Sequence, residues 1–185
     1  MYLSARSRMA FDVQHWLPLI LLAVANLGLA EDFRLESAGG RFGYAASDGA
    51  SDFHQAEAFA DWKLPWGLDL GRQFALGTRL DLSGGWLGDS HKSAFLATVG
   101  PTLVLSKGRF PVSIEGGLSP TFISRYNFPS RDFGSVCQFT SHAGVNIDLF
   151  SWLRLGYRFQ HMSNGGLSHP NPGLNLHVFG VSYLF

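Results

Sequence analysis

The feature that most constrains the fold is a regular alternation of apolar and polar residues over long stretches of the chain. In residues 138–149, for example, apolar Phe139, Val145 and Ile147 alternate with polar Thr140 and Asn146. Successive side chains of a β-strand point to opposite faces, so a period of two is typical of strands with two different environments. The alternation predicts eight strands, over residues 33–46, 53–64, 73–87, 92–106, 110–125, 134–149, 152–163 and 174–185. Clusters of Gly, Pro, Asn and Asp between these runs predict turns.

The two faces of these strands differ in kind. In residues 152–163 one face carries Leu155, Tyr157 and Phe159, while the other carries Arg154 and Arg158. A soluble sandwich or a lipocalin-like barrel would turn the apolar face inward, whereas a transmembrane barrel turns it outward to lipid. The periodicity by itself fits both arrangements.

Three further features favour the membrane. The predicted strands are long enough to cross a bilayer at a tilt, which takes about 9–11 residues. Charged residues make up only 15% of the chain, against roughly 25% in soluble domains, and aromatic residues gather near strand ends. The chain stops on Tyr183-Leu184-Phe185, a terminal aromatic that resembles the assembly signal of bacterial outer-membrane barrels.

We therefore predict an all-β fold, an eight-stranded antiparallel transmembrane β-barrel. A barrel of this size is narrow, and side chains fill its lumen. The charged residues expected to pair within it are Glu57, Asp61, Arg79, Asp81, Glu115, Arg154 and Arg158.

The N-terminus has the build of a secretory signal peptide. Arg6 and Arg8 precede an apolar run that begins at Leu17, and the small residues Gly28-Leu29-Ala30 follow it. The apolar run of about 15 residues is shorter than the ~20 that a membrane-spanning helix needs. We predict that residues 1–30 are a cleaved signal peptide and that residues 31–185 form the barrel domain, exported to the cell outer membrane.

Composition excludes several classes of function. Lys+Arg and Asp+Glu number 14 each, so the chain has no basic surplus with which to bind nucleic acid. The single cysteine excludes an intramolecular disulfide and a cysteine-based zinc cluster. No group of His, Asp and Glu has the spacing of a metal site. Neither a metal nor an organic cofactor is expected.

The outward apolar row includes Tyr157 and Phe159. The period of two continues this row with His161 and Ser163. Polar side chains in such a row are costly unless they are used or hydrogen-bonded. A histidine can take the proton of a serine hydroxyl and return it to a leaving group, which is the chemistry of acyl transfer. The amides of Asn164 and Gly166 are candidate donors to an oxyanion. The alternative is a strand that turns polar only because it leaves the bilayer.

The same segment resembles a known family. Phe159-Gln-His-Met-Ser-Asn-Gly-Gly-Leu167, then Asn171-Pro-Gly173 and a strand that ends at Phe185, is similar to the lipid A 3-O-deacylase family over about residues 154–185. Members of that family are eight-stranded outer-membrane barrels that hydrolyse the 3-O-linked acyl chain of lipid A. The resemblance therefore implies a serine esterase whose substrate is lipid A or lipopolysaccharide.

The resemblance also implies roles for single residues. His161 matches the general base, Ser163 the nucleophile, and Asn164 and Gly166 the oxyanion donors. One position departs from the family, because Asn175 stands where the family has a catalytic glutamate. An Asn oxygen can still accept from an imidazole N–H and fix its tautomer, but it cannot stabilise the imidazolium by charge. Asn175 is therefore a tentative third member of the site.

Two other functions fit the sequence. One is a non-catalytic small outer-membrane barrel with a structural or adhesive role, and the other is a soluble lipocalin-like binder. The length of the acyl chain that is cleaved and the oligomeric state are left open by the sequence.

Overall fold

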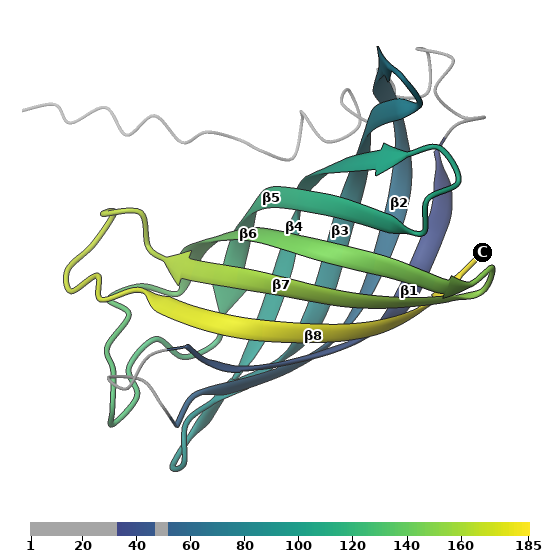
Figure 1. Cartoon of the computed structure of the whole chain (residues 1–185). Coiled ribbons are helices and arrows are strands. Elements are labelled where there is room, and N and C mark those ends of the chain that lie inside the picture. The colour runs from purple at the N-terminus through teal and green to yellow at the C-terminus, as the bar shows by residue number, and fades with distance from the viewer. Residues whose placement is uncertain (1–32, 47–51) are drawn as a thin grey trace, which may run out of the picture. The chain divides into compact units, whose positions relative to one another are not determined.

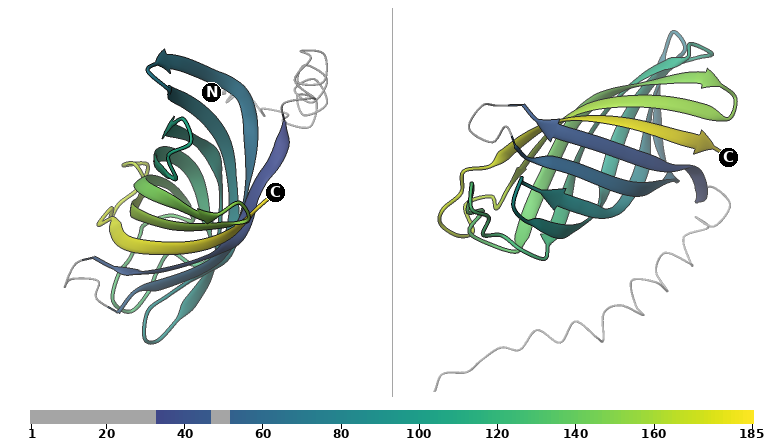
Figure 2. Two further views of the ribbon diagram at one scale, coloured as in Figure 1. Left: turned by 45° about the vertical axis from the view of Figure 1, so that its right-hand side comes forward. Right: turned by 90° about the horizontal axis from the view of Figure 1, so that it is seen from below.

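The computed structural model describes residues 33–46 and 52–185, which form a closed antiparallel barrel of eight strands (Figure 1). The strands are β1 (Arg34–Ala45), β2 (His54–Gly71), β3 (Phe74–Gly88), β4 (Ser93–Lys107), β5 (Val112–Ile123), β6 (Cys137–Phe150), β7 (Leu153–Ser163) and β8 (Leu174–Leu184). Each strand pairs with its neighbours in sequence, and β1 closes the barrel against β8 (Figure 2). The predicted fold class is confirmed.

The apolar face of the barrel points outward. Residues such as Leu118, Val181 and Tyr183 are more than half exposed, whereas their polar strand neighbours Ser119 and Ser182 are buried in the lumen. A soluble barrel would have the opposite arrangement, so the face pattern that the sequence left open is settled in favour of a lipid-facing exterior.

The charges that the sequence placed in the lumen form ion pairs there. Arg158 contacts Glu115 at 2.9 Å and Asp81 at 3.3 Å, and the side chains of all three are at most 10% exposed. Arg41, which the sequence reading did not single out, contacts Asp81 at 2.6 Å and Glu57 at 3.3 Å. Buried charges are tolerated only when paired, so this network explains how a narrow lumen holds so many of them.

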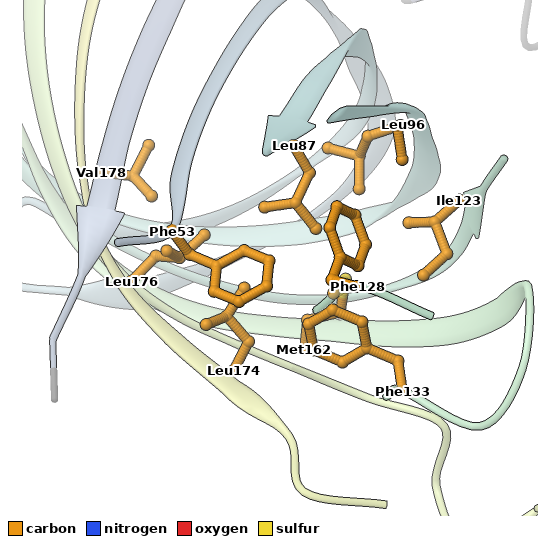
Figure 3. Packing of buried hydrophobic residues seen from close by; sticks show 11 residues of the cluster. Phe53, Leu87, Leu96, Ile123, Phe128, Phe133, Met162, Leu174, Leu176 and Val178 are labelled. Carbon is orange, nitrogen blue, oxygen red and sulfur yellow. The ribbon is translucent and has the colours of Figure 1, made fainter. Parts of the chain in front are cut away.

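The two ends of the barrel differ. The connections 89–92, 124–136 and 164–173 lie at one end, here called the loop end, and the short turns lie at the other, here called the hairpin end. At the loop end a cluster of apolar side chains packs inside the barrel (Figure 3). Phe53, Phe128 and Phe133 pack edge to face with ring centroids 5.2 to 5.8 Å apart. Met162 and Leu174 lie in the same cluster, here called the apolar plug.

One predicted turn is wrong. The predicted second strand, residues 53–64, ends before the turn signal Pro65-Trp66-Gly67, but β2 continues to Gly71. Pro65 lies where the register between β2 and β3 shifts, between the pairs Leu64–Thr78 and Gly67–Gly77. A bulge tolerates the missing N–H of proline, so the ladder resumes beyond it. The actual turn is at Arg72 and Gln73, which both adopt positive φ.

The predicted signal peptide, residues 1–30, lies outside the described residues. Within the described part of the chain, no helix is long and apolar enough to span a membrane.

Candidate active site

The candidate site lies on the outer face of β7 and β8, next to the loop end. The period of two places His161 and Ser163 outward, while Met162 between them is 1% exposed and packs in the apolar plug. On β8, Asn175 points outward between Leu174 and Leu176, which are both buried in the plug. The plug therefore fixes the two strand ends that carry the polar side chains.

His161 and Asn175 are brought together. The two residues are directly paired across β7 and β8, and His161 Nδ1 lies 2.7 Å from Asn175 Oδ1. A carboxamide oxygen only accepts hydrogen bonds, so Nδ1 carries the proton and donates it. The neutral imidazole then has its lone pair on Nε2, which is the atom that a general base needs.

Ser163 is the last residue of β7 and lies on the same face as His161. Residues two apart on a strand are about 6–7 Å apart at the backbone, within reach of an imidazole that turns toward the hydroxyl. The described residues include no direct hydrogen bond between the two side chains. A second serine, Ser141 on β6, lies opposite His161 on the other side of β7.

Gly173 is a site residue that the sequence reading did not assign. A Cβ at this position would lie 2.8 Å from His161 Cε1 and 3.5 Å from Nε2, so the glycine makes room for the ring. Its φ of 64° also favours glycine. Arg131 from the 124–136 loop donates hydrogen bonds to the carbonyl oxygens of Pro172 and Gly173, which ties that loop to the strand end beside His161. The Asn171-Pro-Gly173 motif was the only sequence signal for this contact.

The groups of the two predicted oxyanion donors, Asn164 and Gly166, hydrogen-bond within the loops. The Asn164 side chain is fully buried, and its Nδ2 lies 2.9 to 3.0 Å from the carbonyl oxygens of Phe133, Ser168 and Pro170. Its Oδ1 accepts from the backbone N–H of Gly166 at 2.9 Å. Asn164 thus connects the 124–136 and 164–173 loops, and its role and that of Gly166 toward an oxyanion stay predictions.

Possible metal ligands gather elsewhere at the loop end. Ligand atoms of Asp52, Asp89 and His91 lie within 4.8 Å of one another. Burial disfavours the charged form of Asp89, but hydrogen bonds from the backbone N–H groups of His91 and Lys92 and from the Ser130 hydroxyl outweigh it and lower the pKa of this carboxyl. These loop contacts account for the position of Asp89 without an ion.

Comparison with known proteins identifies one family. Residues 54–184 match the family described as Lipid A 3-O-deacylase (PagL). A stretch of 72 residues is 38% identical to Lipid A deacylase PagL of Bordetella bronchiseptica (strain ATCC BAA-588 / NCTC 13252 / RB50), and it covers 39% of this chain and 40% of that protein. The chain thus aligns with about two-fifths of the length of this curated relative.

Two solved structures are similar in fold. The crystal structure of the outer membrane enzyme PagL superposes with a TM-score of 0.71 at 16% identity, covering 80% of this chain and 99% of that one. The crystal structure of Neisserial surface protein A (NspA) superposes with a TM-score of 0.52 at 14% identity, covering 82% and 96%. At these identities the superpositions establish the barrel alone, and the family match is what distinguishes between an enzyme and another small barrel.

Proposed function

This chain belongs to the lipid A 3-O-deacylase (PagL) family, and we propose that it is a serine esterase of the outer membrane that hydrolyses the 3-O-linked acyl chain of lipid A. The observation that carries the proposal is the 2.7 Å hydrogen bond between His161 and Asn175, on a lipid-facing surface and beside Ser163. A base held in one tautomer next to a hydroxyl is the arrangement that serine hydrolysis requires.

In the first step Ser163 Oγ attacks the carbonyl carbon of the ester, and His161 Nε2 takes the hydroxyl proton. The bond between the carbonyl carbon and the sugar oxygen then breaks, and the imidazolium gives its proton to that departing oxygen. The acyl group is left as an ester on Ser163.

In the second step a water molecule attacks the acyl-serine carbonyl while His161 Nε2 takes one of its protons. The bond to Ser163 Oγ breaks, the proton returns to that oxygen, and a free fatty acid leaves. Asn175 acts through both steps by keeping the proton on Nδ1, so that Nε2 is available each time.

The position of the site suits this substrate. Barrels of the outer membrane have short turns on the periplasmic side and longer connections outside. The longer connections of this chain lie at the loop end, beside His161 and Ser163. The site then faces the leaflet that contains lipopolysaccharide, and the substrate reaches it laterally without entering the lumen.

Release of fatty acid from purified lipid A tests the proposal. We expect the detergent-solubilised protein to release one acid per lipid A and the Ser163→Ala variant to release none. Ser141→Ala is the matched control, because Ser141 also faces outward beside His161 but plays no part in the mechanism. Full activity in Ser163→Ala, or an equal loss in Ser141→Ala, would contradict the assignment of the nucleophile.

The alternative of a non-catalytic barrel is not favoured. A purely structural or adhesive barrel would not account for the match of residues 54–184 to a family of deacylases.

A further inference from the structure

A second polar pair lies on the same outer face, one step further from the loop end. His177 on β8 follows Asn175 in the outward row and is paired across the strands with Phe159. Its Nδ1 lies 2.9 Å from the hydroxyl of Tyr157. The mechanism proposed above uses neither side chain.

This pair has unused hydrogen-bonding capacity. Among the residues that the structure describes, Tyr157 is the only hydrogen-bond partner of the His177 ring. If the Tyr157 hydroxyl donates to Nδ1, the N–H of Nε2 and a lone pair of the phenol oxygen remain unused. In the other tautomer the phenol O–H and the lone pair of Nε2 remain. Either way one donor and one acceptor are left, and each is costly on a surface that faces hydrocarbon.

The surroundings of the pair are aromatic. The His177 ring lies 5.5 Å from the Tyr44 ring and 5.6 Å from the Phe159 ring, and the Tyr157 ring lies 5.2 Å from that of Phe179. The unused donor and acceptor therefore lie among apolar ring surfaces on the lipid-facing side of the barrel.

The pair is also continuous with an apolar groove. A groove of about 800 Å³ on the outer surface is lined by Phe179 and Val181 on β8 and by Phe42 on β1. Its floor is made of small residues, Ala56, Ala58 and Gly84, and Trp86 lines it on β3. Phe179, which packs against Tyr157, is therefore part of both features.

From these observations we propose that Tyr157 and His177 bind the hydroxyl group of a hydroxylated acyl chain, whose hydrocarbon tail lies in the groove. An alcohol donates one hydrogen bond and accepts others, so it matches the unused donor and acceptor of the pair together. This subsite rests on the proposed function, because it would hold a second chain of the lipid whose ester reaches Ser163. It makes the enzyme selective for lipids with hydroxylated chains.

Two synthetic glucosamine lipids test the subsite. Both carry the same ester-linked chain at position 3, and they differ only in whether the N-linked chain is 3-hydroxytetradecanoyl or tetradecanoyl. We expect the wild-type protein to show a KM about threefold to tenfold lower for the hydroxylated lipid, the effect of one or two hydrogen bonds. Tyr157→Phe and His177→Phe should each bring the ratio of the two KM values to about one, with kcat for both lipids retained.

Tyr44→Phe is the matched control. It removes a phenol hydroxyl from another ring that packs on His177 but forms no hydrogen bond with it among the described contacts. This variant should keep the wild-type preference. Equal KM values in the wild type, a preference that persists in both pair variants, or an equal loss in Tyr44→Phe would overturn the proposal. The last two results would indicate that the rings serve only as part of an interfacial aromatic belt.

Binding measurements distinguish a failure of this inference from a failure of the proposed function. The affinities of the Ser163→Ala variant for the two lipids can be compared in detergent without any hydrolysis. A preference for the hydroxylated lipid, together with no acid release by the wild type, would overturn the proposed function and support the subsite. Equal affinities would overturn the subsite whether or not the wild type is active.

Discussion

Asn175 has an unusual place in the proposed chemistry, because it stands where the family has a catalytic glutamate. It accepts a hydrogen bond from His161 but carries no charge to stabilise the imidazolium. Asn175→Ala should lower kcat by roughly threefold to tenfold, the effect of one hydrogen bond. Asn175→Glu should raise kcat by about tenfold, because charge-assisted hydrogen bonds are roughly twice as strong as neutral ones. Fatty-acid release by the three proteins in one detergent measures this, and identical rates would exclude Asn175 from catalysis.

Gly173 tests whether the space beside the His161 ring matters. A Cβ at position 173 would lie 2.8 Å from Cε1, so Gly173→Ala should displace the ring and lower kcat at least tenfold. Gly71→Ala is the control, because Gly71 has a similar φ of 74° but nothing within 4 Å of an added Cβ, and it lies at the hairpin end. The backbone strain of about 1 kcal/mol is then common to both variants. Equal activities of the two variants would show that the ring contact is unimportant.

Asn164 distinguishes a structural role from an oxyanion role. Removing its amide leaves three carbonyl oxygens without this donor. Asn164→Ala should therefore lower the free energy of unfolding by about 2 kcal/mol or more, as measured by urea titration in detergent with tryptophan fluorescence. A variant with wild-type stability and no activity would instead support the oxyanion role that the sequence predicted.

At the scale of elements, the strand alternation of β7 and β8 links the apolar plug to the site. Met162 is buried in the plug, and the adjacent residues on both sides are the proposed base and nucleophile. Met162→Ala should destabilise the barrel by roughly 2–5 kcal/mol through the cavity it leaves, and it should lower kcat because the strand end loses its support. Met162→Leu, which nearly conserves volume, should cost less than about 1.5 kcal/mol. Unfolding and fatty-acid release of both variants check this, and full activity in a destabilised Met162→Ala would separate the plug from the site.

The elements also show what the sequence could predict. The face of each strand followed from the period of two, and this was enough to place His161, Ser163 and Asn175 on one surface. The end of β2 was missed because Pro65 is a strong turn signal, and only the register of β3 shows that a bulge absorbs it. The contacts of Asn164 were missed for a related reason. They involve Phe133, 31 residues earlier in the chain, and such long-range bonds leave no local pattern.

At the scale of the whole molecule, the barrel separates the polar and apolar side chains that alternate along the strands. Charges such as Arg41 and Asp81 pair inside, at 2.6 Å, and the outer face is left to lipid. The proposed catalytic side chains, His161 and Ser163, lie on this lipid-facing side. The proposed reaction therefore takes place on the outer wall of the barrel, and none of its steps uses a side chain of the lumen.

The most direct test of this account is the mass of lipid A extracted from the outer membrane of cells that produce the protein. Cells with the wild-type chain should contain lipid A that is lighter by one ester-linked acyl chain, and cells with Ser163→Ala should contain the unmodified lipid at equal protein levels. Ser141→Ala should behave as the wild type. Unmodified lipid A in wild-type cells, or the same loss of one chain in Ser163→Ala cells, would contradict a serine esterase acting on lipid A from the barrel surface.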